Sequence, residues 1–335
     1  MSSPDAFLPL MRLVNGFQVS AAISAAATLG IADLLVAGPR SSDDLAAATG
    51  THPRSLYRLL RALAAVGVFH EDDERRFALT PMSECLRSDA PVPAGPWAEF
   101  IGRPYFWNTW NDLLYSVRTG ENAFLHRNGI DVWEYRKRNP EDSRAFNHAM
   151  EGLSRSIVAD VVRTYDFTRF AIIVDVAGGT GAMLAGILRA HESARGIVFD
   201  LPHVVEGAPK VLAAAGVADR CEIVGGDFFT SVPRGDALIL KAILHDWDDK
   251  EATAILRCCR DAIAPDGKLL VLERVVAPPN QGPEAKFGDL MMHVLPGGLE
   301  RTVDEFVALF ATAGFRLTNS IPTGTRMNVI EAEPV

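Results

Sequence analysis

The second half of the chain contains short apolar segments that alternate with longer helical ones, and this alternation restricts the possible folds more than any other feature. The five apolar, β-prone segments are residues 171–176, 196–199, 221–224, 237–240 and 269–272. Helical patterns separate them, for example at residues 182–190 and 251–264. Strands that are apolar at every position belong to parallel sheets buried on both faces. We therefore expect a doubly wound, Rossmann-like α/β sheet, with its ligand at the carboxyl ends of the strands.

The chain up to about residue 90 follows a different pattern, of short helices that lead into a small β-element. Apolar residues at helical spacing cover residues 14–35, and a serine pair precedes a short predicted helix at residues 43–48. Pro53 is typical of the first turn of another helix. Residues 68–80 read as a hairpin with a charged turn. A helix-turn-helix followed by a hairpin predicts a winged helix.

A winged helix admits DNA binding as one interpretation, with Arg54, Arg58 and Arg61 as candidate phosphate contacts. The flanking segments, however, carry six acidic residues, which are Asp43, Asp44, Glu71, Asp72, Asp73 and Glu74. A packing or dimerisation module is therefore the better interpretation of this region.

Charge and composition argue against nucleic acid and membranes as partners. The 335 residues carry a formal net charge of −9, whereas both of those partners require concentrated basic residues. The most apolar window, residues 19–35, is interrupted by polar side chains, and no basic segment precedes it, so we expect neither a spanning helix nor a signal peptide. The four cysteines lack the spacing of a zinc site or disulfide framework. Together these features predict a cytoplasmic protein.

Residues 91–165 form a helical stretch that is rich in aromatic side chains. Such side chains are more often core than pocket, but their density in a short segment is compatible with a flat apolar pocket. Trp107 is our candidate from this stretch for contact with a flat, aromatic small molecule.

The first predicted strand ends in a small-residue turn, residues 175–181, that leads directly into a helix. Small residues allow a ligand to approach the backbone, and a helix N-terminus offers free N–H groups. The spacing matches neither the dinucleotide fingerprint nor a phosphate-binding loop. Asp175, placed just before the glycines, would repel a polyphosphate and favours a ligand with positive charge.

Acidic residues also end the next two predicted strands. Asp200 stands one βα unit downstream, where an acid can bind both hydroxyls of a ribose, and Asp227 stands where a carboxylate can accept from an exocyclic amine. A single Asp at a strand end is more often a helix cap or a turn former. Acids at three successive strand ends favour a ligand-binding edge.

His245 follows the fourth predicted strand, at the edge where the ligand must lie, and Glu273 ends the fifth. Glu300 follows a turn that contains Gly297 and Gly298. An imidazole beside two carboxylates is suited to act as a general base toward a phenol or similar hydroxyl. Each acid alone is equally typical of a surface or an ion pair, so their convergence is a hypothesis.

Taken together, these motifs resemble the caffeate-type small-molecule O-methyltransferases of plants and bacteria, which depend on S-adenosylmethionine. The resemblance is carried by residues 174–181, 200–202, 226–229, Lys241, 245–247 and 296–302. It extends over nearly the whole chain, because the family also has an N-terminal winged-helix dimerisation domain. The resemblance therefore implies a homodimer and a Rossmann-like methyltransferase sheet.

The same resemblance implies roles for individual residues. The residues that the resemblance implies as cofactor contacts are Ala177, Gly178, Gly179, Asp200, Asp227, Phe228, Lys241 and Ser154. The general base is His245, positioned by Glu273 and Glu300, and no metal is implied. Contacts to the acceptor fall to Met150, Trp107, Asp246, Met291 and Met292, although a methionine at such a position is about as often core filler.

Two departures from the family pattern have consequences. Ala177 replaces the usual first glycine, and its methyl group is tolerated only if the backbone there has a negative φ. Leu295 replaces an asparagine of the plant enzymes, so a plant-type hydroxycinnamate is not the expected acceptor.

These observations predict a winged-helix-like dimerisation domain at residues 1–95, a helical linker to the acceptor pocket at 96–165 and a cofactor-binding catalytic domain at 166–335. The expected reaction is methyl transfer to a hydroxyl of an aromatic or polyketide-type secondary metabolite. A phenolic hydroxyl is the preferred candidate. Two alternatives stay open. One is a relative with the same cofactor that hydroxylates or decarboxylates instead, and the other is a ligand-responsive DNA-binding regulator.

Overall fold

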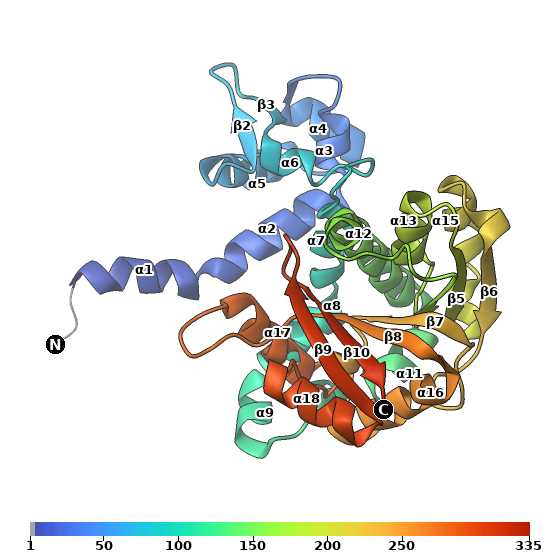
Figure 1. Cartoon of the computed structure of the whole chain (residues 1–335). Coiled ribbons are helices and arrows are strands. Elements are labelled where there is room, and N and C mark those ends of the chain that lie inside the picture. The colour runs from blue at the N-terminus through green and yellow to red at the C-terminus, as the bar shows by residue number, and fades with distance from the viewer. Residues whose placement is uncertain (1–3) are drawn as a thin grey trace. The chain divides into compact units, whose positions relative to one another are not determined.

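The computed structural model describes residues 4–335 and divides them into two compact units (Figure 1). One unit holds the described residues up to Trp107 together with Glu141–Ser156, and the other holds Asn108–Pro140 and Ile157–Val335. Two helices, α8 (Pro104–Asn111) and α12 (Pro140–Thr164), contribute to both units. The functional boundaries expected near residues 95 and 165 stay a prediction.

The larger unit is built on a seven-stranded sheet of order β6-β5-β4-β7-β8-β10-β9. The strands are β4 (Ile172–Val176), β5 (Arg195–Asp200), β6 (Cys221–Gly225), β7 (Gly235–Lys241), β8 (Ile263–Glu273), β9 (Phe315–Pro322) and β10 (Asn328–Pro334). The five strands expected from the sequence run parallel, as predicted. β10 and β9 extend the sheet antiparallel, which the sequence analysis missed. The doubly wound fold is confirmed.

Helices cover both faces of this sheet because successive strand residues point to opposite faces. In β4, Ile173 packs with α13 and the end of α12, whereas Val174 packs with α16 and α18. The elements of this unit that are not strands are α9 (Leu113–Thr119), α10 (Ala123–Asn128), α11 (Val132–Arg138), α13 (Ala182–Ala190), α14 (Pro202–Val205), α15 (Ala208–Ala214), η1 (Ala218–Arg220), η2 (Leu244–Asp246), α16 (Asp249–Ala262), α17 (Pro283–Val294) and α18 (Val303–Thr312). The full burial of both faces explains the uniformly apolar strands.

The strand order determines where a ligand binds. The chain places β5 and β6 on one side of β4 and then crosses to place β7 and β8 on the other. In open α/β sheets of this kind, ligands bind beside the carboxyl ends of the two strands at which the strand order reverses, here β4 and β7. The small-residue turn follows β4, and His245 follows β7, so both lie at this switch point.

The smaller unit contains the helices and hairpin expected at the N-terminus. Its elements are α1 (Pro4–Val14), α2 (Gly16–Thr28), α3 (Ile31–Leu34), β1 (Arg40–Ser41), α4 (Ser42–Thr49), α5 (Pro53–Ala65), β2 (Phe69–Glu71), β3 (Arg76–Leu79), α6 (Pro81–Glu84) and α7 (Gly95–Ile101). The Ser41 side chain caps α4 by accepting from the Asp44 N–H. The helical pattern at residues 14–35 is broken at Gly30, which has a φ of 64°. β1 joins the hairpin in a three-stranded sheet of order β1-β3-β2.

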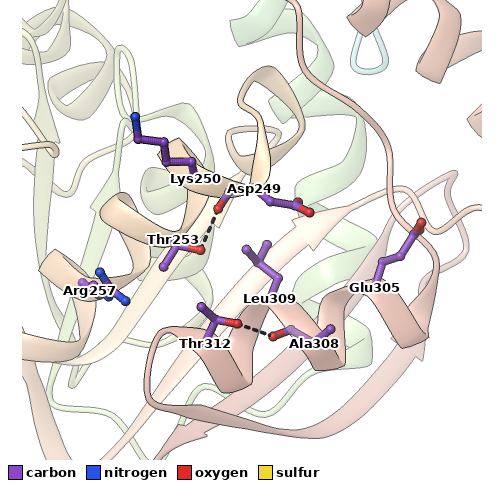
Figure 2. A pocket seen from close by; sticks show the side chains of 8 residues that line it. All are labelled: Asp249, Lys250, Thr253, Arg257, Glu305, Ala308, Leu309 and Thr312. Atoms are coloured by element: carbon purple, nitrogen blue, oxygen red, sulfur yellow. Dashed lines mark hydrogen bonds between the residues drawn. The ribbon is translucent and has the colours of Figure 1, made fainter.

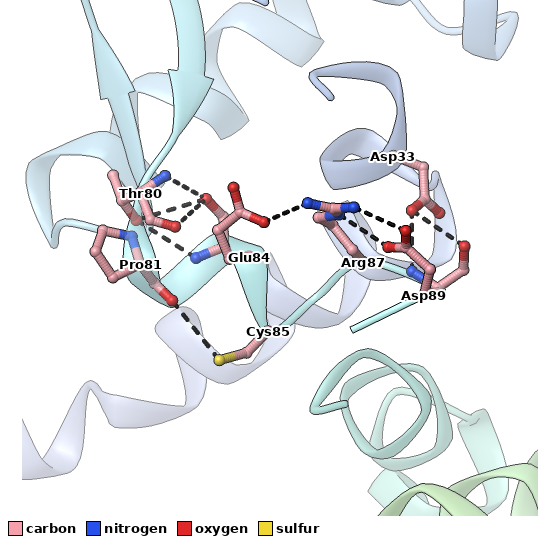
Figure 3. Close-up of polar contacts among 9 residues, drawn as sticks. Asp33, Thr80, Pro81, Glu84, Cys85, Arg87 and Asp89 are labelled. Atoms are coloured by element: carbon pink, nitrogen blue, oxygen red, sulfur yellow. Dashed lines mark hydrogen bonds and ion pairs between the residues drawn. The ribbon is translucent and has the colours of Figure 1, made fainter. Parts of the chain in front are cut away.

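Polar contacts fasten the segment after the hairpin (Figure 3). Thr80 and Ser83 form a reciprocal capping box that starts α6. Arg87 then pairs with Glu84 at 2.6 Å and with Asp89 at 2.8 Å. Because these ion pairs are exposed to water, they contribute little to the free energy of folding. Their main effect is to restrict the path of the chain.

The N-terminal helices expose a row of large apolar side chains, which are Phe7, Leu8, Leu10, Leu13, Val14, Phe17 and Val19. Among the described residues, Asp5–Thr28 is one helical stretch with the length and composition of a membrane span, where we expected none. By itself such a stretch is weak evidence for a span, because other apolar helices meet the same criteria. An exposed apolar row of this kind marks an interaction surface.

Packing of α13 against α12 depends on a glycine. A Cβ at Gly186 would lie 3.0 Å from Val158 Cγ1 and closer still to Cγ2. We expect Gly186→Val to lower the free energy of unfolding by about 1–3 kcal/mol through overpacking, measured by denaturant titration. Ala190→Val, at the exposed end of α13, is the control and should cost less than about 1 kcal/mol. Equal losses in the two variants would contradict the packing interpretation.

Candidate active site

The turn after β4 requires small residues. Gly179 and Gly181 have φ of 61° and 80°, a region that favours glycine. A Cβ at Gly178 would lie 2.6 Å from Cγ of Asp175, so even alanine has no room there. The turn therefore exposes main chain, rather than side chains, at the switch point.

Ala177 departs from the expectation for this turn. Its φ is 56°, so the condition under which we expected a methyl group to be tolerated, a negative φ, is not met. A left-handed conformation costs a residue with a Cβ roughly 1–2 kcal/mol. The surrounding structure thus imposes a glycine-like conformation on an alanine, and such strain is concentrated at functional sites.

Two acids and a lysine flank the turn. Asp200 accepts from the Gly179 N–H at 2.8 Å and from the Leu201 N–H at 2.7 Å, and burial raises its pKa. Burial also raises the pKa of Asp175 to about 7, although the charge of Lys241 opposes this. The pKa of Lys241 is lowered, again by burial. Asp175 Oδ2 is buried and has no hydrogen-bond partner among the described residues.

Asp227 lies at the end of the neighbouring strand, in the turn that follows β6. Its carboxylate accepts from the Phe229 N–H at 2.9 Å, so it is a turn former. Phe228 packs edge-to-face on Trp247, with ring centroids 6.0 Å apart. Trp247 in turn stacks on Trp133. The assignment of Asp227 and Phe228 to a cofactor stays a prediction.

The structure brings together His245, Glu273 and Glu300. His245 lies on η2, and its Nδ1 is 3.2 Å from Oε1 of Glu300. Glu273 binds the main chain instead, because its Oε1 accepts from the N–H groups of Ile243 and His245, both at 3.1 Å. One ligating atom from each of the three side chains lies within 4.8 Å of the others. One carboxylate thus orients the imidazole, and the other fixes the turn that carries it.

Two residues of the segment 296–302 secure this turn, a role that was not predicted for them. Arg301 is fully buried and donates to the carbonyl groups of Leu244 and Trp247, at 2.9 and 3.0 Å, and to Asp249. A Cβ at Gly298 would lie 2.6 Å from the Trp247 nitrogen and closer to the His245 carbonyl. The only sequence signal for either residue is its position beside Glu300, because the burial of an arginine is a tertiary property.

Charge dominates the chemistry of this cluster. Burial lowers the pKa of His245, but Asp246, Glu300 and Glu273 outweigh it and raise the pKa to about 9. Burial raises the pKa of Glu273 to about 7. For Glu300 burial is outweighed by the hydrogen bond and charge of His245 and by Arg274, so its pKa is lowered. The imidazolium form is thus stabilised by the surrounding carboxylates.

Asp246 lies on the other side of the ring from Glu300. Its Oδ1 is 3.7 Å from His245 Nε2, and burial raises its pKa to about 6. The charges of His245 and Arg136 act against that rise. Asp246 is thus placed beside the nitrogen that faces away from Glu300.

The other predicted acceptor contacts, together with the predicted cofactor contact Ser154, are divided between the two units. Met291 and Met292 lie on α17, where Met292 is 5% exposed and packs as core, and Met291 is half-buried. Trp107, Met150 and Ser154 belong to the smaller unit. Ser154 is buried, and its hydroxyl donates to the Met150 carbonyl at 2.9 Å within the helix. The predicted binding roles of these five residues stay predictions.

A separate depression lies between α16 and α18 (Figure 2). It is lined by Asp249, Lys250, Thr253, Arg257, Glu305, Ala308, Leu309 and Thr312. None of the predicted site residues lines it, so it is not our candidate for the active site.

Comparison with known proteins places the chain among methyltransferases. Residues 110–316 match the model of the "O-methyltransferase domain" family, and residues 11–89 match the "O-methyltransferase dimerisation domain". The phenazine O-methyltransferase of Lysobacter antibioticus is 43% identical over 330 residues, which are 97% of this chain and 96% of that protein. The 8-amino-8-demethylriboflavin N,N-dimethyltransferase of Streptomyces davaonensis is 38% identical over 319 residues, covering 94% and 91% of the two chains.

A solved structure gives the same result in three dimensions. It is an O-methyltransferase from neocarzinostatin biosynthesis in complex with S-adenosylmethionine and 2-hydroxy-5-methyl naphthoic acid. Its TM-score to this chain is 0.77, at 33% identity, over 95% of this chain and 96% of its own.

The contact between His245 and Glu300 has a measurable consequence. An NMR titration of the His245 imidazole, identified by its loss in His245→Asn, should give a pKa well above the usual 6.5. Glu300→Gln removes a negative charge that stabilises the imidazolium, so we expect it to lower this pKa by at least one unit. Glu305→Gln, an exposed change near the start of α18, should leave it unchanged. An equal pKa in wild type and Glu300→Gln would contradict the geometry.

Proposed function

The chain belongs to the family of S-adenosylmethionine-dependent O-methyltransferases that act on secondary metabolites, and from this premise we propose that it methylates an aromatic hydroxyl with His245 as the general base. One observation carries the proposal. His245 Nδ1 contacts the buried Glu300 carboxylate, which leaves Nε2 as the nitrogen that can accept a proton.

The residues at the switch point fit the family's cofactor. S-adenosylmethionine supplies an electrophilic methyl group on a positively charged sulfur. The buried oxygen of Asp175, which has no hydrogen-bond partner among residues 4–335, and the Asp200 carboxyl line this edge with acidic groups, which suits a cation and disfavours a polyphosphate. We propose that the main chain of the turn at Ala177, Gly178 and Gly179 holds the methionine part, with Lys241 beside it, while the cofactor contact of Ser154, in the smaller unit, stays a prediction. Asp200 would then hold the ribose, and Asp227 and Phe228 the adenine.

The acid–base chemistry of His245 suits a phenolic acceptor. A phenol has a pKa of about 10, so an imidazole with the ordinary pKa of 6.5 would accept its proton at a large energetic cost. The three carboxylates raise the pKa of His245 to about 9, close to that of the phenol. The accepted proton then remains on an imidazolium that Glu300 stabilises. We place Asp246, Met291 and Met292 at the acceptor, while the acceptor contacts of Trp107 and Met150, in the smaller unit, stay predictions.

The comparisons support an aromatic acceptor and leave an amine as the second candidate. The neocarzinostatin enzyme is in complex with a naphthoic acid, and the riboflavin-type relative is named for methylation of an amine. A hydroxyl must lose its proton as it attacks, whereas a neutral amine attacks through its lone pair. A base with three carboxylates around it therefore favours the hydroxyl. Parallel assays of phenols and matched anilines separate the two.

We also propose that the chain is a homodimer formed through its N-terminal segment. The match to a dimerisation domain covers residues 11–89, and this segment includes the second part of the exposed apolar row, Leu13, Val14, Phe17 and Val19. A second copy would bury that row. Cytoplasmic location and the lack of nucleic-acid and membrane partners stay predictions from composition.

Replacement of the base tests the proposal most simply. We expect His245→Ala to lower the rate of methyl transfer to the best phenol of a panel by about 10²–10⁴-fold at neutral pH, the usual contribution of a general base. Affinity for S-adenosylhomocysteine, measured by calorimetry, should stay within about twofold. In the wild type, kcat/KM should rise with pH, because only the neutral imidazole accepts a proton. An unaltered rate in His245→Ala would refute the assignment.

The packing of Gly298 against the His245 turn gives a second test. We expect Gly298→Ala to displace the turn and lower kcat by roughly 10²-fold, the scale of a misplacement near 1 Å. Binding of S-adenosylhomocysteine should persist. Gly16→Ala adds the same methyl group within a helix, at a φ that alanine adopts and with no atom within 4 Å, so it should retain the rate. A wild-type kcat for Gly298→Ala would contradict the role of this contact.

A further inference from the structure

Arg274 follows directly after Glu273, at the carboxyl end of β8, and contacts the candidate site from the side of α17. Its Nη1 is 3.2 Å from Oε1 of Glu300. This is the same oxygen that lies 3.2 Å from Nδ1 of His245. The other oxygen of Glu300, Oε2, is buried without a hydrogen-bond partner among the described residues. One carboxylate oxygen therefore serves both cations.

From this shared oxygen we propose that Arg274 is a positioning residue that limits how strongly Glu300 stabilises the His245 imidazolium. The inference deepens the proposed function, because it rests on His245 being the base. Arg274 lies outside the family motifs described above, and these motifs assign it no role.

The guanidinium reaches Glu300 through a gap that a glycine provides. A Cβ at Gly288, on α17, would lie 2.8 Å from Nη1 of Arg274 and 3.0 Å from Oε1 of Glu300. The Nε of Arg274 is also buried without a partner among the described residues. The Glu300 side chain is fully buried and that of Arg274 is 20% exposed, so water screens this charge pair less than it would at the surface.

Charge balance explains why such a residue is useful. The imidazole faces a negative excess, because Asp246, Glu273 and Glu300 surround it. The other charged groups that bear on the cluster are Lys241 at the end of β7, Arg136 on α11, Asp289 on α17 and Arg301. A base that stays protonated at neutral pH cannot accept a proton. Arg274 offsets part of the effect of the Glu300 charge on the imidazole. A larger fraction of His245 is therefore neutral at pH 7.

The test compares the His245 titration in variants of the full chain, followed by NMR without cofactor or acceptor. Arg274→Gln removes the positive charge, so the pKa of His245 should rise by roughly one unit. Arg274→Lys keeps the charge and should restore most of the wild-type value. Arg274→Met serves if the glutamine variant does not fold, with the same expected rise.

Gly288→Ala provides an independent variant that keeps every charge. Its methyl group would lie 2.8 Å from Nη1 of Arg274 and 3.0 Å from Oε1 of Glu300, and the flexible end of Arg274 should move aside. With the His245–Glu300 contact shown to be intact in a crystal structure of the variant, the pKa of His245 should rise as it does in Arg274→Gln. Arg316→Gln is the matched control, because Arg316 is exposed and pairs with Glu333 on β10. It should leave the titration unchanged.

The rate profile supplies the second readout. In Arg274→Gln the acidic limb of kcat/KM should move to higher pH by the same amount, so methyl transfer falls roughly tenfold at pH 7 and recovers at high pH. A merely structural role would lower the rate at every pH. A His245 pKa that is equal in wild type, Arg274→Gln and Gly288→Ala would overturn the inference. Failure of the proposed function is a different result, namely no methyl transfer by the wild type to any phenol.

Discussion

The contact between one buried imidazole and one buried carboxylate is the interaction on which the rest of the site depends. His245 and Glu300 lie 55 residues apart and meet only because β7, β8 and the segment after α17 end at the same edge of the sheet. An ion pair in a low-dielectric interior is costly unless its geometry is good and its remaining atoms are satisfied. The fold meets this requirement in part: Arg274 contacts Glu300, the Asp289 carboxylate accepts from the Glu300 N–H and Glu273 accepts from the main chain of the turn, whereas Oε2 of Glu300 has no hydrogen-bond partner among the described residues.

Around this pair the structure favours a fixed geometry over simple stability. Arg301 uses a fully buried guanidinium to hold the two carbonyl groups on either side of His245 and Asp246. Gly298 lets the segment before Glu300 pack directly on the same turn. Buried polar groups contribute little net free energy, but each one restricts where its partner can lie. A base that must meet an acceptor hydroxyl within hydrogen-bond distance benefits from that restriction.

The sequence predicts the parts of the molecule that follow a local pattern. The five parallel strands, α13 and α4 are read from apolar runs, spacing and capping residues, and the residues that follow the strands, such as Asp200 and His245, come with them. β9 and β10 were not predicted, because their residues alternate or are polar and so do not form an apolar run. The positive φ of Ala177, the burial of Arg301 and the shared oxygen of Glu300 arise from contacts between distant segments. No single sequence contains that information in local form.

The measurement that tests the central claim most directly is a crystal structure of the protein with S-adenosylhomocysteine and a phenol that it methylates. If His245 is the base, its Nε2 will lie about 2.6–3.2 Å from the phenolic oxygen, with Nδ1 still on Glu300. An imidazole that points away from the phenol, or a phenolic oxygen that contacts another base, would contradict the claim.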